Sequence, residues 1–174
     1  MFEENQEIVD SFYNESKSLV VQLVELLEKV EGDFGQIKRL EVYGQTVDRI
    51  MGAAKSIALA FPEGHLIYKI GDVSAICKAV GYQASQIKDN EEFFNVCVAL
   101  LLDATELLDE MLNSLKAGEN SDIKEVVTSA FVNRLKWVSS KFGSEVRASV
   151  AAKDPTQDKM SQGEIDDLLK KLGL

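Results

Sequence analysis

Residue types that often carry catalytic chemistry are scarce in this chain of 174 residues. It has one histidine, His65, two cysteines, Cys77 and Cys97, and two prolines. The cysteines lack CxxC spacing and have no histidine cluster beside them, so the sequence predicts no zinc site. Both are expected to be reduced core residues. Nothing in the sequence suggests a glycine-rich phosphate loop or a Ser-His-Asp set.

Basic residues and long apolar runs are also in short supply. The chain has 19 basic and 29 acidic residues, with a formal net charge of −10. Such a charge repels nucleic acid and anionic membrane surfaces, so neither is an expected partner. No apolar run reaches transmembrane length, and the first ten residues carry no lysine or arginine. These features predict a soluble, cytoplasmic protein without membrane insertion.

The apolar residues recur with the helical period, and strand-like alternation is rare. We therefore predict an all-α fold, an antiparallel helical bundle of four to five helices with a flexible linker and a short C-terminal amphipathic helix. Helices are predicted over residues 7–30, 34–61, 91–115 and 122–150, with an interrupted helix over 70–87 that breaks or bends around Gly81. Gly44 and other small residues of the second helix would let a neighbour approach closely. Trp137 is predicted to pack in the core.

Composition divides the chain into a helical bundle over residues 1–150, a polar linker over 151–160 and a docking helix over 161–174. The last segment begins with a capping box, Ser161 and Glu164. Its apolar residues share one face: Ile165, Leu168, Leu169 and Leu172. A helix this short does not persist alone in water. Its leucine face can bind a partner's groove or fold back on the bundle, and the polar linker favours the partner.

The C-terminal sequence Ser-Gln-Gly-Glu-Ile-Asp-Asp-Leu-Leu-Lys-Lys-Leu-Gly-Leu resembles the tail of the CheZ phosphatases of bacterial chemotaxis. That family's pattern is Ser-Gln, two variable residues, Val-Asp-Asp-Leu-Leu, two variable residues and Leu-Gly-Phe. Part of it is also similar to the regulator-binding peptide of the flagellar switch protein FliM. Both families bind the response regulator CheY in this way, which implies a role in two-component signalling and flagellar rotation. The implied partner-binding residues are Ser161, Gln162, Glu164, Ile165, Asp166, Asp167, Leu168, Leu169, Leu172 and Leu174.

A second segment, Glu41-Val-Tyr-Gly-Gln45-Thr-Val-Asp-Arg49-Ile-Met51, resembles the catalytic Asp-Leu-Thr-Gly-Gln helix of the same family. The resemblance implies that Gln45 enters the active site of a CheY-type regulator, preferably a phosphorylated one, and orients water. Glu41 replaces the family's aspartate and would contact the regulator's lysine. The chain would need no cofactor of its own, because Mg²⁺ is expected in the regulator. An amide suits this task, since it accepts and donates hydrogen bonds without adding negative charge beside a phosphoryl group.

Other interpretations remain open at this level. Glu41 and Gln45 can be ordinary solvated residues of an acidic helix. The region around Tyr68 to Tyr82 faintly resembles histidine phosphotransfer (Hpt) domains, but His65 lacks the required following Lys-Gly, so it is predicted to be a loop or packing residue. A regulator-binding adaptor without catalysis is a third interpretation. The CheZ family forms homodimers, so a homodimer is possible here, although the order of helices differs from that plan.

Overall fold

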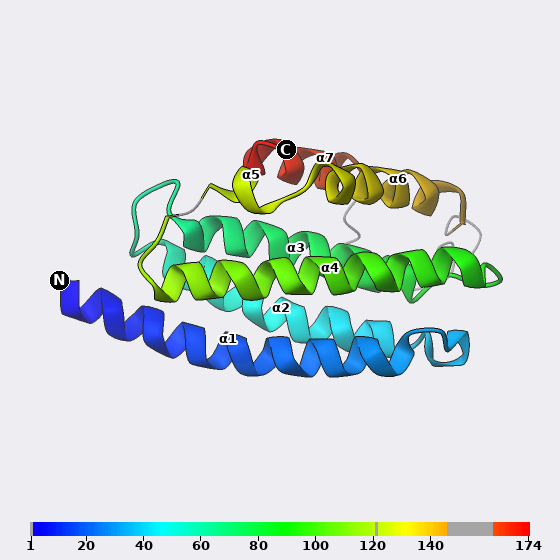
Figure 1. The fold of residues 1–174 in the computed structure, drawn as a ribbon, viewed down its shortest axis with the longest axis horizontal. Helices are drawn as coiled ribbons and strands as arrows, with labels where there is room; N and C mark the ends of the chain where they lie inside the picture. Colours follow the sequence, from blue (N-terminus) through cyan, green and yellow to red (C-terminus); the bar gives the residue numbers. More distant parts are fainter. Residues whose placement is uncertain (1, 121, 146–161) are drawn as a thin grey trace.

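The computed structural model describes residues 2–120, 122–145 and 162–174, and helices account for most of them (Figure 1). The predicted all-α class is confirmed, because these ranges contain no strand. The helices are α1 (Phe2–Val30), α2 (Arg39–Ala58), α3 (Leu66–Ala84), α4 (Glu91–Lys116), α5 (Ile123–Val126), α6 (Ser129–Glu145) and α7 (Gln162–Leu172), with a 3-10 turn, η1, at Phe34–Gln36.

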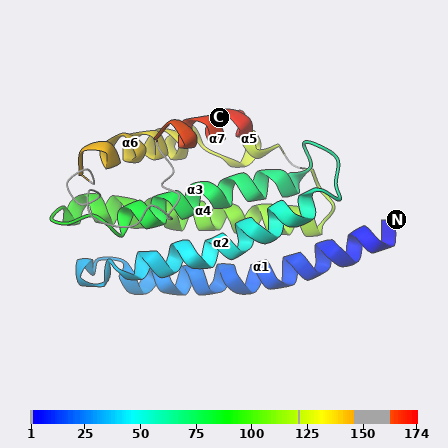
Figure 2. The same cartoon turned by 180° about the vertical axis from the view of Figure 1, so that it is seen from behind.

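The four long helices α1 to α4 surround the main core. Helix α1 packs against α2 and α4, and α3 packs against the same two helices. Figures 1 and 2 show each of these helices returning along the one before it. Apolar residues at helical spacing turn inward from all four helices, as expected for amphipathic helices that share a core. The fully buried large side chains include Leu23, Leu27, Leu40, Tyr43, Ile50, Ile70, Phe94, Leu101 and Leu108.

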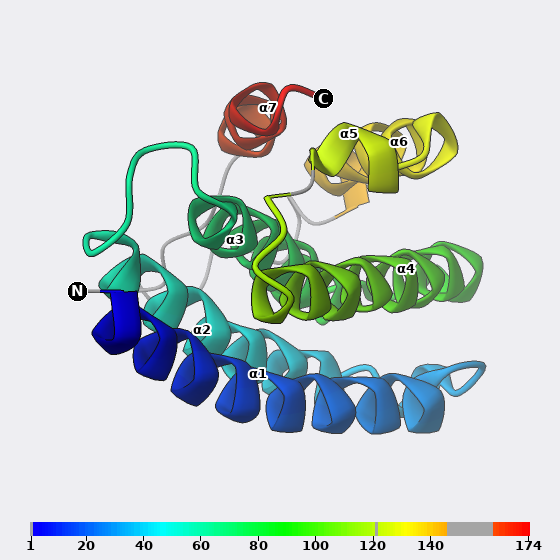
Figure 3. The same ribbon diagram turned by 60° about the vertical axis from the view of Figure 1, so that its left-hand side comes forward.

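The shorter helices form a second layer over α3 and α4. Helix α6 packs against α4 and α3, and α7 packs against α3 and α6. The end-on view in Figure 3 shows α7 above α3 and α6 above α4. The side of α3 that faces away from α2 is covered by this layer, which explains why buried residues surround α3 on nearly all sides.

Helices α2 and α3 interlock through two reciprocal glycine–tyrosine contacts. A Cβ atom at Gly44 would lie 3.0 Å from the Tyr82 ring, and one at Gly81 would lie 2.8 Å from the Tyr43 ring. The predicted close approach at Gly44 is thus confirmed. The predicted break around Gly81 is wrong, since α3 runs through this residue to Ala84. Gly81 serves the packing of Tyr43 rather than a bend.

The prediction of one continuous helix over residues 122–150 is also wrong, because this region contains two helices, α5 and α6. The chain is extended at Val127, and Thr128 begins α6 by accepting a hydrogen bond from the Phe131 N–H through Oγ1, at 3.2 Å. Trp137 is 48% exposed, in contrast to the predicted core position, although its ring meets Phe93 edge to face. Residues 146–150 and the predicted linker over 151–160 lie outside the described residues.

Within the described ranges, no helix combines the length and apolar content needed to cross a membrane.

Candidate functional site

Glu41 and Gln45 lie one turn apart on the outer face of α2. The inner face of the same helix is fixed by Leu40, Tyr43, Gly44 and Val47, which are all buried. Residues four apart on a helix share a face, so this packing turns Glu41 and Gln45 away from the core. Gln45 is exposed and Glu41 is partly exposed. The structure therefore brings the two predicted site residues together on an accessible surface.

Glu41 has a weak ionic partner on its own helix turn. Its Oε1 lies 3.4 Å from Lys38 Nζ, and both side chains are largely exposed. Solvent screens such pairs strongly, so the contact leaves the carboxylate free to exchange partners. The Gln45 side chain makes no hydrogen bond to any residue in the described ranges. Both ends of its amide are therefore available to an external group.

Residues of α3 border Glu41 and Gln45 on one side. Lys78 Nζ donates to Asp48 Oδ1 at 2.8 Å, which joins α3 to α2. Partial burial raises the pKa of Tyr82, the nearby Lys78 ammonium lowers it, and the carboxylates of Asp48 and Glu41 raise it again. These four ionisable groups thus gather along one helix junction. Sequence reasoning missed Lys78 and Tyr82, because they lie far from Glu41 along the chain.

An exposed apolar residue of the same helix borders Gln45 on the other side. Val42 is 49% exposed and lies about one turn from Gln45. The ion pair between Arg49 and Glu15, at 3.1 Å, joins α2 to α1 beyond it. Gln45 therefore stands between apolar and charged surroundings.

The predicted docking helix α7 is folded onto the bundle. Ile165, Leu169 and Leu172 are buried at 0%, 2% and 4% exposure, whereas Glu164 and Asp167 are exposed. Of the other predicted docking residues, Asp166, Leu168 and Leu174 are partly buried. Ser161 and the side chain of Gln162 lie outside the described residues. The alternative in which this helix folds back on the bundle is the one that the structure adopts.

A cradle of apolar side chains on α3, α5 and α6 receives α7. We define this cradle by six of the residues that line the small cavity beneath α7, namely Val73, Ile76, Cys77, Ile123, Phe131 and Leu135. Helix α7 ends in a Schellman motif: the Gly173 N–H donates to the Lys170 carbonyl and the Leu174 N–H to the Leu169 carbonyl, both at 2.9 Å. Gly173 has φ +76°, which glycine adopts without strain.

The tail and the Glu41/Gln45 surface are separate in the fold. Helix α7 is seated on α3 and α6, whereas Glu41 and Gln45 face outward from α2. The sequence placed both groups in one functional scheme but did not predict their relative positions.

His65 has a structural role at the start of α3. Its Nδ1 accepts a hydrogen bond from the Ile67 N–H at 3.3 Å, and its ring stacks on Phe61 with a centroid separation of 4.5 Å. Partial burial lowers the pKa of His65. The prediction of a loop or packing residue is confirmed, since His65 caps α3 through Nδ1 and packs on Phe61.

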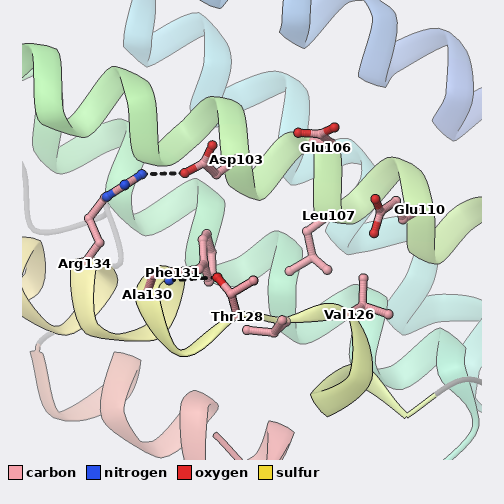
Figure 4. A pocket seen from close by; sticks show the side chains of 10 residues that line it. Asp103, Glu106, Leu107, Glu110, Val126, Thr128, Ala130, Phe131 and Arg134 are labelled. Atoms are coloured by element: carbon pink, nitrogen blue, oxygen red, sulfur yellow. Dashed lines mark hydrogen bonds and ion pairs between the residues drawn. The ribbon is translucent and has the colours of Figure 1, made fainter.

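A further groove of about 270 Å³ lies between α4 and α6. Figure 4 shows Arg134 of α6 reaching across to Asp103 of α4, and their charged groups are 2.5 Å apart. Glu106 and Glu110 lie further along α4. The apolar lining comes from Leu107, Val126, Val127, Ala130 and Phe131. Residues 2–120, 122–145 and 162–174 contain no group of three or more His, Cys, Asp or Glu side chains suited to holding a metal ion.

No protein-family model matches the sequence, and comparisons with curated proteins and with solved structures also find no match. The resemblance to CheZ therefore rests on the two short segments that carry it.

Proposed function

We propose that this protein is a cytoplasmic phosphatase that removes the aspartyl phosphate from a CheY-type response regulator. The observation that carries the proposal is Gln45, an exposed glutamine with an unengaged amide, one turn from Glu41 on a helix whose inner face is fixed in the core. The regulator would meet this surface of the antiparallel bundle, and α7 would supply a second contact.

The proposed hydrolysis needs no covalent bond between this chain and the phosphoryl group. Hydrolysis of an acyl phosphate needs a water molecule held in line with the breaking bond and neutralisation of charge on the phosphoryl oxygens. The Gln45 carbonyl oxygen would accept a hydrogen bond from that water. The regulator's own lysine and Mg²⁺ would neutralise the charge. Glu41 would exchange Lys38 for the regulator's lysine, which would orient the two proteins.

The surroundings of Gln45 suit insertion into another protein. Val42 supplies apolar area beside it, and the Asp48–Lys78 pair supplies charges on the other side. Apolar area next to charged groups is a common composition of protein interfaces. The amide itself is uncharged, so a phosphoryl group would not repel it.

An adaptor that holds a regulator without hydrolysing its phosphate is the second candidate. The exposed Asp167 side chain of α7 favours it, because this carboxylate is on the surface even while the leucine face is buried. A phosphotransfer function is less well supported, since His65 caps α3 and is part of the helix start.

The test is phosphate release from acyl-phosphorylated CheY. The wild-type chain should accelerate release, and Gln45→Ala should abolish the acceleration while binding is kept. Gln6→Ala, a change at an exposed glutamine near the start of α1, serves as the matched control and should behave as wild type. Binding without acceleration by the wild-type chain would support the adaptor instead.

Docking through α7 is tested with Asp167→Lys rather than with a truncation. Removing α7 would uncover the apolar cradle and disturb the fold, whereas the Asp167 side chain is exposed. The substitution should weaken association with CheY and leave hydrolysis at saturating regulator unchanged. Equal affinity of Asp167→Lys and wild type would argue against docking through this residue.

A further inference from the structure

We infer that α7 is an intramolecular latch whose leucine face has two mutually exclusive seats, the cradle of this chain and the response regulator. The inference rests on the proposed function and adds a regulation to it. In the closed state the cradle holds the docking face, and the regulator must displace α7 from the cradle before it binds this face.

The fit between α7 and the cradle is close. The cavity that remains beneath the helix has a volume of about 10 Å³, at the lower limit of the space that a water molecule needs. Leu169, Leu172 and Leu174 close it from the side of α7. The cradle is therefore a formed binding surface whose occupant is known, rather than an incidental contact of a chain end.

An electrostatic attraction and close packing are found at the end of α7. Asp72 on α3 is half-buried, and it interacts with Lys171 of α7 and Lys55 of α2. Burial raises the pKa of Asp72, while these two lysines lower it. Beyond the helix, Gly173 lies against the end of the Lys124 side chain, and a Cβ atom there would lie 2.7 Å from Lys124 Cε, a flexible group that can move aside. The chain end thus packs against α5.

The two seats compete because α7 has one apolar face. Ile165, Leu169 and Leu172 are all turned into the bundle, and the solvent side carries Glu164, Asp167 and Lys170. A partner that binds the leucines cannot do so while the cradle covers them. The apparent affinity for the regulator is then lowered by the fraction of molecules that are open, and weakening the cradle raises it.

Asp72→Lys tests this competition in the full-length chain. It replaces an attraction to Lys171 with a repulsion, and it leaves every residue of α7 unchanged. Charge interactions between half-exposed groups stabilise by up to about 1 kcal/mol, so we expect binding to CheY to tighten about two- to fivefold. Glu31→Lys, the same change of charge in the exposed turn after α1, is the matched control and should leave the affinity unchanged.

The two native cysteines report opening differently. Cys77 lines the cavity beneath α7, with its thiol also next to Tyr43 of α2, whereas Cys97 on α4 is fully buried elsewhere in the core. Modification of Cys77 by a thiol reagent should become severalfold faster in Asp72→Lys, and also in wild type after CheY is added. The rate at Cys97 should not change. Equal acceleration at both cysteines would indicate loosening of the whole fold and would overturn the latch.

Phe131→Ala provides a second, independent variant. Phe131 lines the cradle and is only partly buried, so the rest of the core should tolerate its loss. It should tighten binding to CheY in the same direction as Asp72→Lys. Binding that is equal in wild type and both variants, with Cys77 unchanged, would overturn the latch while leaving the phosphatase proposal intact.

The phosphatase and latch proposals can be tested separately if binding is measured in the Gln45→Ala background, where no hydrolysis is expected. Tighter binding by Gln45→Ala/Asp72→Lys than by Gln45→Ala supports the latch whether or not the wild-type chain hydrolyses phosphate. A chain that accelerates no hydrolysis but shows this difference is a latched adaptor. Failure of all variants to bind CheY would overturn the regulator as the second occupant and the proposed function together.

Discussion

The hydroxyl of Tyr43 lies 2.9 Å from Thr105 Oγ1 and joins α2 to α4 inside the core. Thr105 also contacts the Leu101 carbonyl oxygen through Oγ1, at 2.6 Å. The threonine proton is therefore directed to Leu101, which makes Tyr43 the donor to Thr105. Burial raises the pKa of Tyr43 well above its usual range, so the phenol keeps its proton.

This direction of donation predicts unequal effects of removing the two hydroxyls. Thr105→Val leaves the buried Tyr43 O–H without its oxygen acceptor and should lower the free energy of unfolding by about 2 kcal/mol. Tyr43→Phe leaves Thr105 bonded to Leu101 and should cost only about 1 kcal/mol. Urea denaturation of the three proteins measures the difference. A larger loss in Tyr43→Phe would reverse the assignment of donor and acceptor.

Two glycines should respond to alanine with opposite signs. Gly81→Ala places a Cβ atom 2.8 Å from the buried Tyr43 ring, so overpacking should destabilise the fold by about 1–3 kcal/mol. Gly52 is at an exposed position of α2, where an added Cβ atom would meet nothing within 4 Å. Gly52→Ala should therefore stabilise the fold by up to about 1 kcal/mol through helix propensity. Thermal unfolding of both variants checks this, and a stabilising Gly81→Ala would show that α2 and α3 can separate easily.

The cap at the start of α3 should be sensitive to pH. Burial lowers the pKa of His65 below its usual 6.5, so the native state binds fewer protons than the unfolded state. The cap's contribution to stability is present above this value and is lost as the pH falls below it, because protonated Nδ1 cannot accept from Ile67. Asn, a good N-cap that does not titrate, should remove this dependence.

The measurement compares melting temperatures of wild type and His65→Asn at about pH 7.5 and about pH 5.5. Other titrating groups affect both proteins alike, so the difference isolates His65. The wild type should lose more of its melting temperature over this interval. Equal losses in the two proteins would mean that the histidine proton is not coupled to folding.

If the proposed function holds, the role of the Glu41 carboxylate can be tested by removing it and by shortening its side chain. Glu41→Ala should reduce hydrolysis of CheY phosphate about tenfold, as expected when one charged contact is lost. Glu41→Asp restores the residue type of the resembled family and should retain activity. Glu28→Asp, a change at an exposed position of α1, is the control. Full activity of Glu41→Ala would remove Glu41 from the mechanism.

The sequence predicted which segments form helices. It predicted less well where some helices end and which residues of different helices contact one another. The residues of α1 and α4 repeat at clean helical spacing, so both ends of α4 and the C-terminal end of α1 agree closely with the prediction, whereas α1 begins five residues earlier than predicted. Gly81 was interpreted as a break, because its real role depends on Tyr43, a residue of another helix. Thr128 was missed as a cap because apolar residues continue on both sides of it.

The candidate site shows the same division between local and distant information. Glu41 and Gln45 share a helix face, so their joint exposure followed from the spacing alone. Lys78 and Tyr82 approach them only through packing of α3 against α2. For the tail, amphipathicity predicted a leucine face in need of burial but could not decide between a partner and the chain's own cradle.

The interlocking of α2 and α3 has a thermodynamic consequence for any protein that meets Gln45. Each helix places a tyrosine ring on a glycine of the other, so the two backbones cannot slide or rotate independently near residue 44. Their conformational freedom is lost when the chain folds, not when a complex forms. On association, the backbone that carries Gln45 needs no further ordering, and a rigid presentation of this kind favours a low entropic cost of recognition at this residue.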